Sequence, residues 1–308
     1  MRRSLLALSR SASVKRLATT APGIAGVVNR FAAGETTESA VEATRELIAA
    51  GLLVSLDHLG EDTLDRAQAT ATRDAYLELL GRLGDEGLAA AAEVSVKLSA
   101  VGQSLTHGGP EFATDNARAI CEAARSVGTT VTLDMEDHST TDLTLSTLHE
   151  LRQDFPTTGA VLQAYLHRTE DDCRALSTPG SRVRLCKGAY KEPETVAFQD
   201  RSDVDRSYVR CLKILLASPC YPMVATHDSR LISIAEALTV RHGREKGGYE
   251  FQMLYGVRRD EQRRLAAAGE KVRIYVPYGS EWYGYLVRRM AERPANLALG
   301  VRAMLGRV

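Results

Sequence analysis

The sequence lacks long hydrophobic segments and has no excess of either charge. Its 308 residues include 39 basic and 39 acidic side chains, which gives a formal net charge of zero. No apolar run approaches the roughly 18 residues that a membrane-spanning helix needs. Without a basic excess, no global field attracts nucleic acid, so recognition of an anion must depend on local clusters. We therefore expect neither a transmembrane protein nor a nucleic-acid-binding protein.

Cysteine is scarce and is not arranged in pairs. The five cysteines contain no C-x-x-C spacing, and their odd number favours free thiols in a reducing compartment over a disulfide framework. Hydrophobic residues make up 44% of the chain and charged residues 25%, which is typical of a soluble globular protein. The length suits one large domain or two small ones.

Several motifs that indicate catalysis are also absent. The seven histidines form no H-x-H or H-E-x-x-H spacing, which argues against a metal-dependent hydrolase, and we expect no metal site. The sequence has no G-x-S-x-G, no Walker phosphate loop and no G-x-G-x-x-G. The common signatures of serine hydrolases and of nucleotide binding are therefore missing.

The first 20 residues, MRRSLLALSRSASVKRLATT, allow two interpretations. They are rich in Arg and Ser, and no acidic residue occurs before Glu35, as in an organellar transit peptide. Their apolar positions also suit an amphipathic helix packed on a domain, which is the interpretation that we favour. We assign residues 1–50 to an N-terminal helical segment packed on the main domain. A basic amphipathic helix is also a candidate for membrane contact.

Eight short β-rich segments alternate with helical periodicity along the remaining chain. The segments are 52–60, 94–101, 130–137, 160–168, 182–190, 222–229, 249–256 and 272–279. Strands that alternate with helices favour parallel βαβ units, and eight such units predict a (βα)8 TIM-like barrel over residues 51–308. The fourth and seventh units are short, which indicates a distorted barrel. A doubly wound open sheet is the alternative, although it usually has fewer strands and a glycine-rich first turn.

Polar side chains occur where the predicted strands end. In a (βα)8 barrel the active site lies at these C-terminal ends. The polar residues at or near the ends are Asp57, Glu61, Lys97, Asp134, Glu136, Gln163, Arg184, Lys187, Thr226, His227, Asp228, Gln252 and Tyr275. Lys97 and Lys187 could serve a Schiff-base aldolase if burial lowers the pKa of the amine. Either lysine could instead form an ion pair with a carboxylate on a neighbouring strand, such as Asp134.

A helix after the last strand gathers four polar side chains on one face. In WYGYLVRRMAERPAN, Tyr285, Arg288, Arg289 and Glu292 follow the spacing i, i+3, i+4, i+7. Pro294 ends the helix near residue 292 or 293. Arginines in a last turn complement the helix dipole, but a pair of them also suits a bidentate clamp on a carboxylate. With Lys97, they would favour an anionic substrate.

Five segments, in this order along the chain, carry a resemblance to a known family. They are VSVKLSA, TLDMED, RLCKGAYKE, YEFQMLYGV and YGSEWYGYLVRRMAERPAN. The chain resembles proline dehydrogenase in its short monofunctional bacterial form, over residues 29–300 or so. The resemblance implies a distorted (βα)8 barrel that holds FAD noncovalently.

The resemblance also implies roles for individual residues. Arg288, Arg289 and Lys97 would bind the proline carboxylate, while Tyr275, Tyr285 and Leu254 would pack on the pyrrolidine ring. Glu61 would pair with Arg288 as a gate. Asp134 would hold Tyr275 or Lys97, and Arg184 would lie beside the flavin N5 atom, which makes these two the catalytic candidates. The residues implied to bind FAD are Met135, Gln163, Arg184, Lys187, Gly188, Ala189, Tyr190, Thr226, His227, Gln252 and Glu292.

The implied reaction is oxidation of L-proline to Δ1-pyrroline-5-carboxylate, the first step of proline degradation to glutamate, with electrons passed to a membrane quinone. The product would go to a separate pyrroline-5-carboxylate dehydrogenase. The implied location is the cytoplasm, with peripheral contact to the inner face of the membrane. The chain departs from the family pattern at Asp228, where bifunctional relatives carry Asn, and at Cys186, where Val is expected. A Schiff-base lyase and a non-catalytic amino-acid-binding barrel stay as alternatives.

Overall fold

The computed structural model describes residues 31–282 and shows a closed barrel of parallel strands in the order β1-β2-β3-β4-β5-β6-β7-β8. The strands are β1 (Leu53–His58), β2 (Ala92–Val96), β3 (Val131–Leu133), β4 (Gly159–Gln163), β5 (Arg182–Cys186), β6 (Tyr221–Ala225), β7 (Glu250–Leu254) and β8 (Val272–Tyr278). β1 pairs with β8 as well as with β2, which closes the sheet. The open-sheet alternative is therefore wrong.

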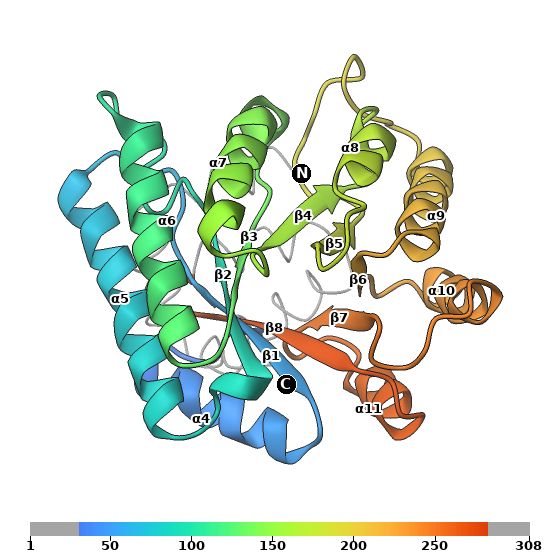
Figure 1. Ribbon diagram of the computed structural model, residues 1–308, viewed down its shortest axis with the longest axis horizontal. Coiled ribbons are helices and arrows are strands. Elements are labelled where there is room, and N and C mark those ends of the chain that lie inside the picture. The colour runs from blue at the N-terminus through green and yellow to red at the C-terminus, as the bar shows by residue number, and fades with distance from the viewer. Residues whose placement is uncertain (1–30, 283–308) are drawn as a thin grey trace, which may run out of the picture.

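Helices connect successive strands and form a ring around the barrel (Figure 1). They are α5 (Arg66–Asp85), α6 (Gly109–Ser126), α7 (Thr141–Asp154), α8 (Thr169–Ala175), α9 (Arg201–Ala217), α10 (Ser229–Arg241) and α11 (Arg259–Ala267), with short 3₁₀ turns η1 (Ala89–Ala91) and η2 (His138–Thr140). The predicted α/β barrel is confirmed. Its distortion is also as expected, because α8 and α11, in the fourth and seventh units, have only 7 and 9 residues.

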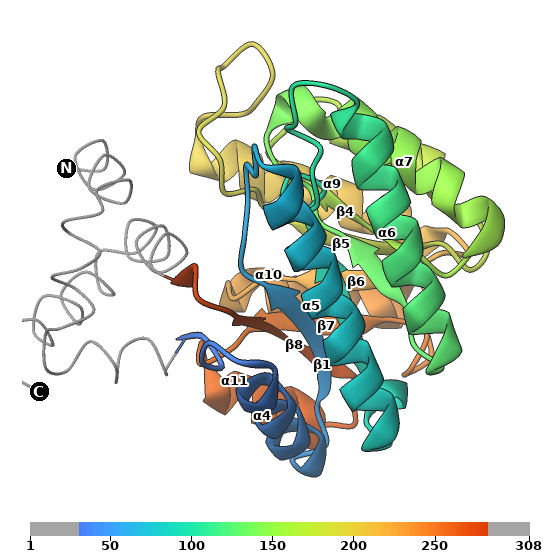
Figure 2. The same cartoon turned by 90° about the vertical axis from the view of Figure 1, so that its left-hand side faces the viewer.

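An additional helix, α4 (Thr37–Ala49), precedes the first strand and packs against β1, β8 and α5. Figure 2 shows it beside β1 and β8. Thr36 begins the helix with a capping box, in which its side chain and that of Ser39 each bond the backbone of the other residue. The chain before α4 also contacts the end of β8, since Ala33 N donates to Pro277 O at 2.8 Å. The division of the chain at residue 50 stays a prediction, and residues 1–30 lie outside the described range.

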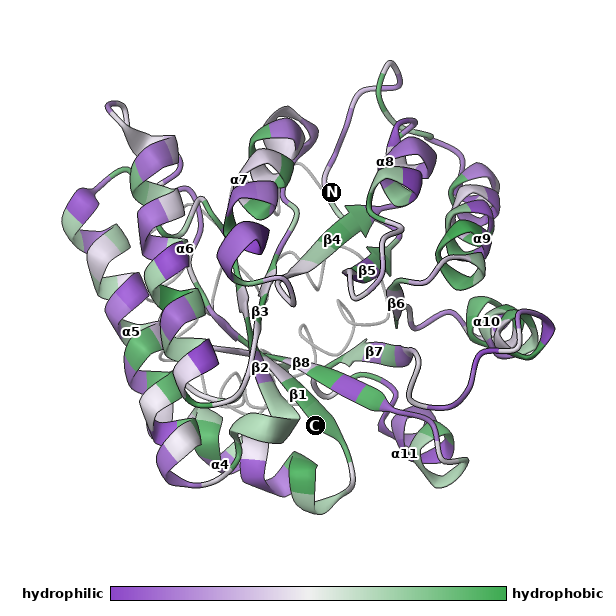
Figure 3. Ribbon diagram, in the orientation of Figure 1, coloured by the Kyte–Doolittle hydropathy of each residue, from purple (hydrophilic) through white to green (hydrophobic). Residues whose placement is uncertain are grey.

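The strands alternate between an apolar outer face and a polar inner face. Val54 and Leu56 of β1 and Val183 and Leu185 of β5 are fully buried in the main hydrophobic core, beneath α5 and α9. The residues between them, such as Ser55 and Arg184, contact one another across the barrel. Figure 3 shows the resulting mixture, with polar bands between apolar ones on β8. This period of two places charged side chains in the barrel interior.

None of the helices within residues 31–282 is long and apolar enough to cross a membrane.

Candidate active site

An ion pair between Lys97 and Asp57 lies at the C-terminal end of the barrel. Lys97 follows β2, and its Nζ donates to both carboxylate oxygens of Asp57 on β1, at 2.7 and 2.6 Å. Asp57 is 1% exposed. Asp134 lies 4.0 Å from the same Nζ. The expected Lys97–Asp134 pair is therefore the longer contact, and the short partner is Asp57.

Asp134, just after β3, joins two further residues of the site. Tyr275 on β8 donates its hydroxyl to Asp134 Oδ2 at 2.6 Å, and Arg184 Nη1 donates to Asp134 Oδ1 at 2.6 Å. The guanidinium carbon of Arg184 also lies 5.3 Å from the centre of the Tyr275 ring, as in a cation–π contact. Lys97 Nζ is 3.5 Å from the Tyr275 hydroxyl. These contacts form one connected network from Asp57 to Arg184. The network lies at the C-terminal end of the barrel, which we call the mouth.

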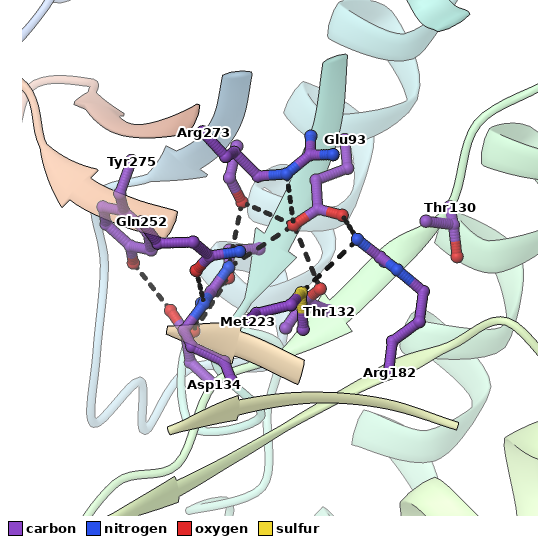
Figure 4. A network of polar contacts seen from close by, with 12 residues as sticks. Glu93, Thr130, Thr132, Asp134, Arg182, Met223, Gln252, Arg273 and Tyr275 are labelled. Atoms are coloured by element: carbon purple, nitrogen blue, oxygen red, sulfur yellow. Dashed lines mark hydrogen bonds and ion pairs between the residues drawn. The ribbon is translucent and has the colours of Figure 1, made fainter. Parts of the chain in front are cut away.

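A second group of charged residues lies below this network, toward the N-terminal ends of the strands. Glu93 of β2 contacts Arg182 at 2.6 Å, and Glu250 of β7 contacts Arg273 at 2.7 Å. Figure 4 shows Glu93 among the arginines and Gln252 beside the Asp134 end of the network. Arg184 connects the two groups, because its Nη2 lies 3.4 Å from Glu93.

Burial and neighbouring charges determine the protonation states of Lys97 and Tyr275 at the mouth. Burial acts to lower the pKa of Lys97, but the carboxylates of Asp57 and Asp134 outweigh it and raise that pKa above its usual value. Burial, together with the two carboxylates, raises the pKa of Tyr275 well above its usual value. Lys97 is therefore an ammonium ion and Tyr275 a neutral hydroxyl donor at neutral pH.

Other polar groups line the ends of β4, β5 and β6. Gln163 donates its amide to Glu136 O at 2.7 Å, and Thr226 Oγ1 accepts from Asp228 N at 3.1 Å. Lys187 Nζ lies between Asp205 and Asp228, at 3.0 Å from the latter. His227 Nε2 accepts from Leu254 N at 2.9 Å, so its proton is assigned to Nδ1.

The turn after β5 depends on glycine. Gly188 has φ 110°, a conformation that L side chains rarely adopt, and a Cβ built on it would lie 2.3 Å from the Tyr165 ring. Tyr190 packs beside the same ring. The backbone of residues 187–189 thus lies close against Tyr165.

Hydrogen bonds tie the loop that carries Glu61 to neighbouring segments at this end of the barrel. Ser99 Oγ accepts from Asp62 N at 3.1 Å, and Glu136 accepts from Ser99 N at 3.1 Å. Glu61 is partly exposed on this loop. The loop after β1 is therefore tied to the loop after β2 and to the end of β3.

Comparisons with known proteins agree on one family. A family model described as proline dehydrogenase matches residues 40–299. The chain is 42% identical to the proline dehydrogenase of Deinococcus radiodurans over 91% of this chain and 90% of that protein. It is 38% identical to proline dehydrogenase 1 of Bacillus subtilis strain 168, again over 90% of both chains.

The chain belongs to the proline dehydrogenase family. It is therefore an oxidoreductase, as the resemblance of its motifs implied.

Solved structures also contain this fold. A proline utilization A (PutA) from Bdellovibrio bacteriovorus, inactivated by N-propargylglycine, superposes with a TM-score of 0.81 and 27% identity over 87% of this chain. A PutA from Bradyrhizobium japonicum gives a TM-score of 0.71 and 26% identity over 89% of this chain. The chain spans about a third of the length of these PutA proteins, at 33% and 31%.

The residues present fit the FAD that the proline dehydrogenase family implies. Amide, ammonium and hydroxyl donors occur on adjacent strands, on Gln163 (β4), Lys187 (after β5) and Thr226 (after β6). Gly188, in the turn after β5, has no side chain of its own, and the Tyr165 ring fills the space that a Cβ would occupy there. Lys97, Asp134, Tyr275 and Asp57 lie on the opposite arc, from β8 through β1 and β2 to β3.

Most of the predicted site residues lie at this end of the barrel, but for some the structure shows no free group or gives no description. Tyr285, Arg288, Arg289 and Glu292 fall outside the described residues. Met135 and Gln252 are buried, and both ends of the Gln252 amide are already bonded, to Arg184 and to Glu250. Ala189 is exposed and Leu254 is partly buried. The roles of all these residues stay predictions.

Sequence reasoning missed the residues that support the network. Ser55, Glu93 and Ser95 were not predicted, although EVSVK places Glu93, Ser95 and Lys97 at alternate positions of one strand. That alternation was the available signal for a polar inner face. Among the described residues, no three or more His, Cys, Asp or Glu side chains are arranged to hold a metal ion.

Proposed function

We propose that this chain oxidises L-proline to Δ1-pyrroline-5-carboxylate with FAD as its cofactor, as the first step of proline degradation. The observation that carries the proposal is the network at the mouth, in which Asp134 joins Tyr275 to Arg184 and lies 4.0 Å from Lys97. Membership of the proline dehydrogenase family supports the choice of substrate.

The substrate half of the site suits a small amino acid with a carboxylate. Lys97 stays protonated beside Asp57, so it presents a fixed positive charge to an anion. Arg288 and Arg289 are proposed to add a bidentate clamp, because a guanidinium fork matches a carboxylate. Tyr275, Tyr285 and Leu254 are proposed to pack on the pyrrolidine ring, with Glu61 as the gate that pairs with Arg288.

The cofactor half is proposed to hold FAD through Gln163, Lys187, Thr226 and the backbone around Gly188. Met135, Ala189, Tyr190, His227, Gln252 and Glu292 are the other proposed cofactor residues. When bound, FAD supplies the acceptor for the hydride from the proline ring carbon C5. Arg184 is proposed to stabilise the negative charge that develops on the cofactor. Asp134 keeps the guanidinium in this orientation.

The partners follow from the chemistry of the proposal. Electrons are proposed to pass to a membrane quinone, and the product to a separate pyrroline-5-carboxylate dehydrogenase. Both partners fit a cytoplasmic protein with peripheral contact to the inner face of the membrane.

The lyase alternative is weaker at Lys97. A Schiff base needs a neutral amine, whereas two carboxylates raise the pKa of Lys97 and Asp57 lies 2.6 Å from its Nζ. Lys187 likewise lies between Asp205 and Asp228. Within residues 31–282, neither lysine makes a contact that favours a free nucleophile.

The test is a steady-state assay of protein reconstituted with FAD, with L-proline as substrate and a soluble quinone analogue as acceptor. The expected result is proline-dependent reduction of the acceptor, with the cyclic imine product trapped by an aromatic amino-aldehyde. D-proline and L-alanine serve as controls that should react far more slowly. Borohydride trapping of a substrate on a lysine, without reduction of the acceptor, would favour the lyase instead.

A further inference from the structure

Glu93 is a buried carboxylate that the proposed chemistry does not use. It lies on β2 in the barrel interior and is 1% exposed. Its oxygens lie 2.6 Å from Arg182 and 3.4 Å from Arg184. Arg273 is 3.9 Å away and has a closer partner of its own, Glu250 at 2.7 Å. Figure 4 shows Glu93 on the far side of the network from Tyr275.

Arg184 is held between two carboxylates. Its Nη1 donates to Asp134 at 2.6 Å, on the side of the mouth. Its Nη2 donates to Glu93 at 3.4 Å, on the opposite side. Ser55 Oγ strengthens the second connection, because it accepts from Arg184 Nη2 at 3.1 Å and donates to Glu93 at 3.1 Å. The Nη2 branch therefore depends on Glu93 both directly and through Ser55.

The charge of Glu93 is permanent under working conditions. Burial alone would raise its pKa, but the guanidinium groups of Arg182, Arg273 and Arg184 outweigh it and lower the pKa to about 2. A fixed negative charge below Arg184 resists rotation of the guanidinium about its bond to Asp134.

We propose that Glu93 is a positioning residue for the proposed oxidation. Its carboxylate contacts Arg184 on the side away from the mouth and fixes the plane and direction of the guanidinium. This inference rests on the proposed function, which gives Arg184 its role. Arg184 also donates from Nε to Gln252 and from Nη1 to Ser95 Oγ at 2.9 Å. Without Glu93, the Nη2 branch keeps only Ser55, so the Nη2 side of the guanidinium loses its fixed direction. The expected consequence is slower chemistry rather than weaker substrate binding, because the substrate residues lie on the other side of Asp134.

A cavity offers a way to test this role chemically. It has a volume of about 330 Å³, opens near the N-terminal ends of the strands and reaches Glu93, Arg182 and Arg273. The rest of its wall is small or polar and consists of Ala90, Ala92, Gly128, Thr129, Thr130 and Thr157. Truncation of Glu93 would enlarge this space, so a small carboxylate such as formate can enter and take the place of the missing side chain.

The first experiment compares Glu93→Gln and Glu93→Ala with the wild-type protein in proline oxidation, with rates normalised to bound FAD. Loss of a supporting contact typically lowers activity about 10- to 100-fold, and we expect a fall of this size in kcat with less than about a threefold change in KM. In Glu93→Ala, sodium formate should restore kcat saturably, whereas sodium chloride at the same ionic strength should not. Glu93→Asp keeps the charge and should fold even if the other variants do not, with a smaller fall in kcat.

Thr132→Val is the matched control. Thr132 donates its hydroxyl to Glu93 at 3.1 Å and is fully buried, so this variant removes a bond to Glu93 but keeps its charge and its contact with Arg184. It should lose some thermal stability and keep kcat. A role of Glu93 in stability alone predicts normal kcat per bound FAD in every folded variant, and this result would overturn the proposal.

A crystal structure of the FAD-free Glu93→Gln or Glu93→Asp protein gives a readout that does not depend on activity. The expected finding is an Arg184 guanidinium that has moved away from Ser55. An unmoved guanidinium would overturn the proposal. Absence of proline oxidation by the wild-type protein, with Arg184 displaced in the variant, would instead reject the proposed function and leave the positioning of Arg184 by Glu93 supported.

Discussion

Tyr275 and Asp134, separated by 141 positions in the sequence, form a 2.6 Å hydrogen bond at the mouth of the barrel. Tyr275 lies on the last strand and Asp134 follows the third, so only closure of the barrel brings them together. The other oxygen of Asp134 accepts from Arg184. One carboxylate thus orients both the tyrosine proposed to pack on the substrate ring and the cation proposed to lie beside the flavin.

Asp134→Asn is predicted to lower kcat about 10- to 100-fold, the range typical of a lost supporting interaction. Tyr275 and Arg184 donate to different oxygens of Asp134, and asparagine replaces one of these oxygens with an NH2 donor, so one of the two bonds is lost. The measurement is steady-state kinetics at saturating proline, normalised to bound FAD. Asp137→Asn is the control, because Asp137 caps the short η2 turn three residues further on and should leave kcat unchanged.

Lys97→Met is predicted to weaken proline binding and also to destabilise the protein. Removal of one partner of a buried ion pair typically costs about 3–5 kcal/mol, because the other charge is left unpaired. Asp57 would be that charge. The double variant Lys97→Met, Asp57→Asn should regain much of the stability in chemical denaturation but not the affinity for proline. Recovery of both properties in the double variant would show that Lys97 does not bind the substrate.

Gly188→Ala is predicted to reduce the FAD content of the purified protein. The new Cβ would lie 2.3 Å from the Tyr165 ring at a φ of 110°, so the turn at residues 187–189 must shift. Gly180→Ala is the control, since Gly180 also has a positive φ, 75°, but a Cβ there meets nothing within 4 Å. Flavin absorbance per protein should fall in the first variant only. An equal loss of flavin absorbance in both variants would show that backbone strain causes the effect, rather than the close contact between residue 188 and Tyr165.

Glu93 predicts a specific pH dependence of stability. Its pKa in the folded protein, about 2, lies below the usual glutamate value of 4.5. The ionised side chain therefore contributes fully to the free energy of unfolding above the unfolded-state pKa, and this contribution is lost as the pH falls toward 2. The shift corresponds to a contribution on the order of 3 kcal/mol. The difference in unfolding free energy between wild type and Glu93→Gln should therefore be largest above about pH 5 and shrink at lower pH. A difference that does not change with pH would contradict the assigned ionisation.

The strands and the mouth of the barrel were predictable because both have local signals. Short β-rich runs such as RVRLCK predict the strands, and the polar residues at the ends of these runs predict the position of the mouth. The partner of Lys97 was not predictable in the same way. β2 lies between β1 and β3, and each of these is associated with an aspartate at its end, Asp57 and Asp134. Only the register of the strands determines which carboxylate comes within 2.6 Å.

Glu93 illustrates a different limit. A buried glutamate in a strand is unfavourable by itself, and nothing near it in the sequence supplies its counterions. Arg182, Arg184 and Arg273 come from β5 and β8, roughly 90 and 180 positions further along the chain. Such an interior network depends on the closed barrel as a whole, so the sequence pattern reveals the polar inner face but not its pairing.

The most direct test of the central claim is anaerobic titration of the FAD-bound protein with L-proline. The account predicts that the absorbance of oxidised flavin disappears on addition of L-proline and that one cyclic imine forms for each flavin reduced. D-proline should leave the spectrum unchanged. A protein that binds FAD but keeps its oxidised spectrum with excess L-proline would contradict the account.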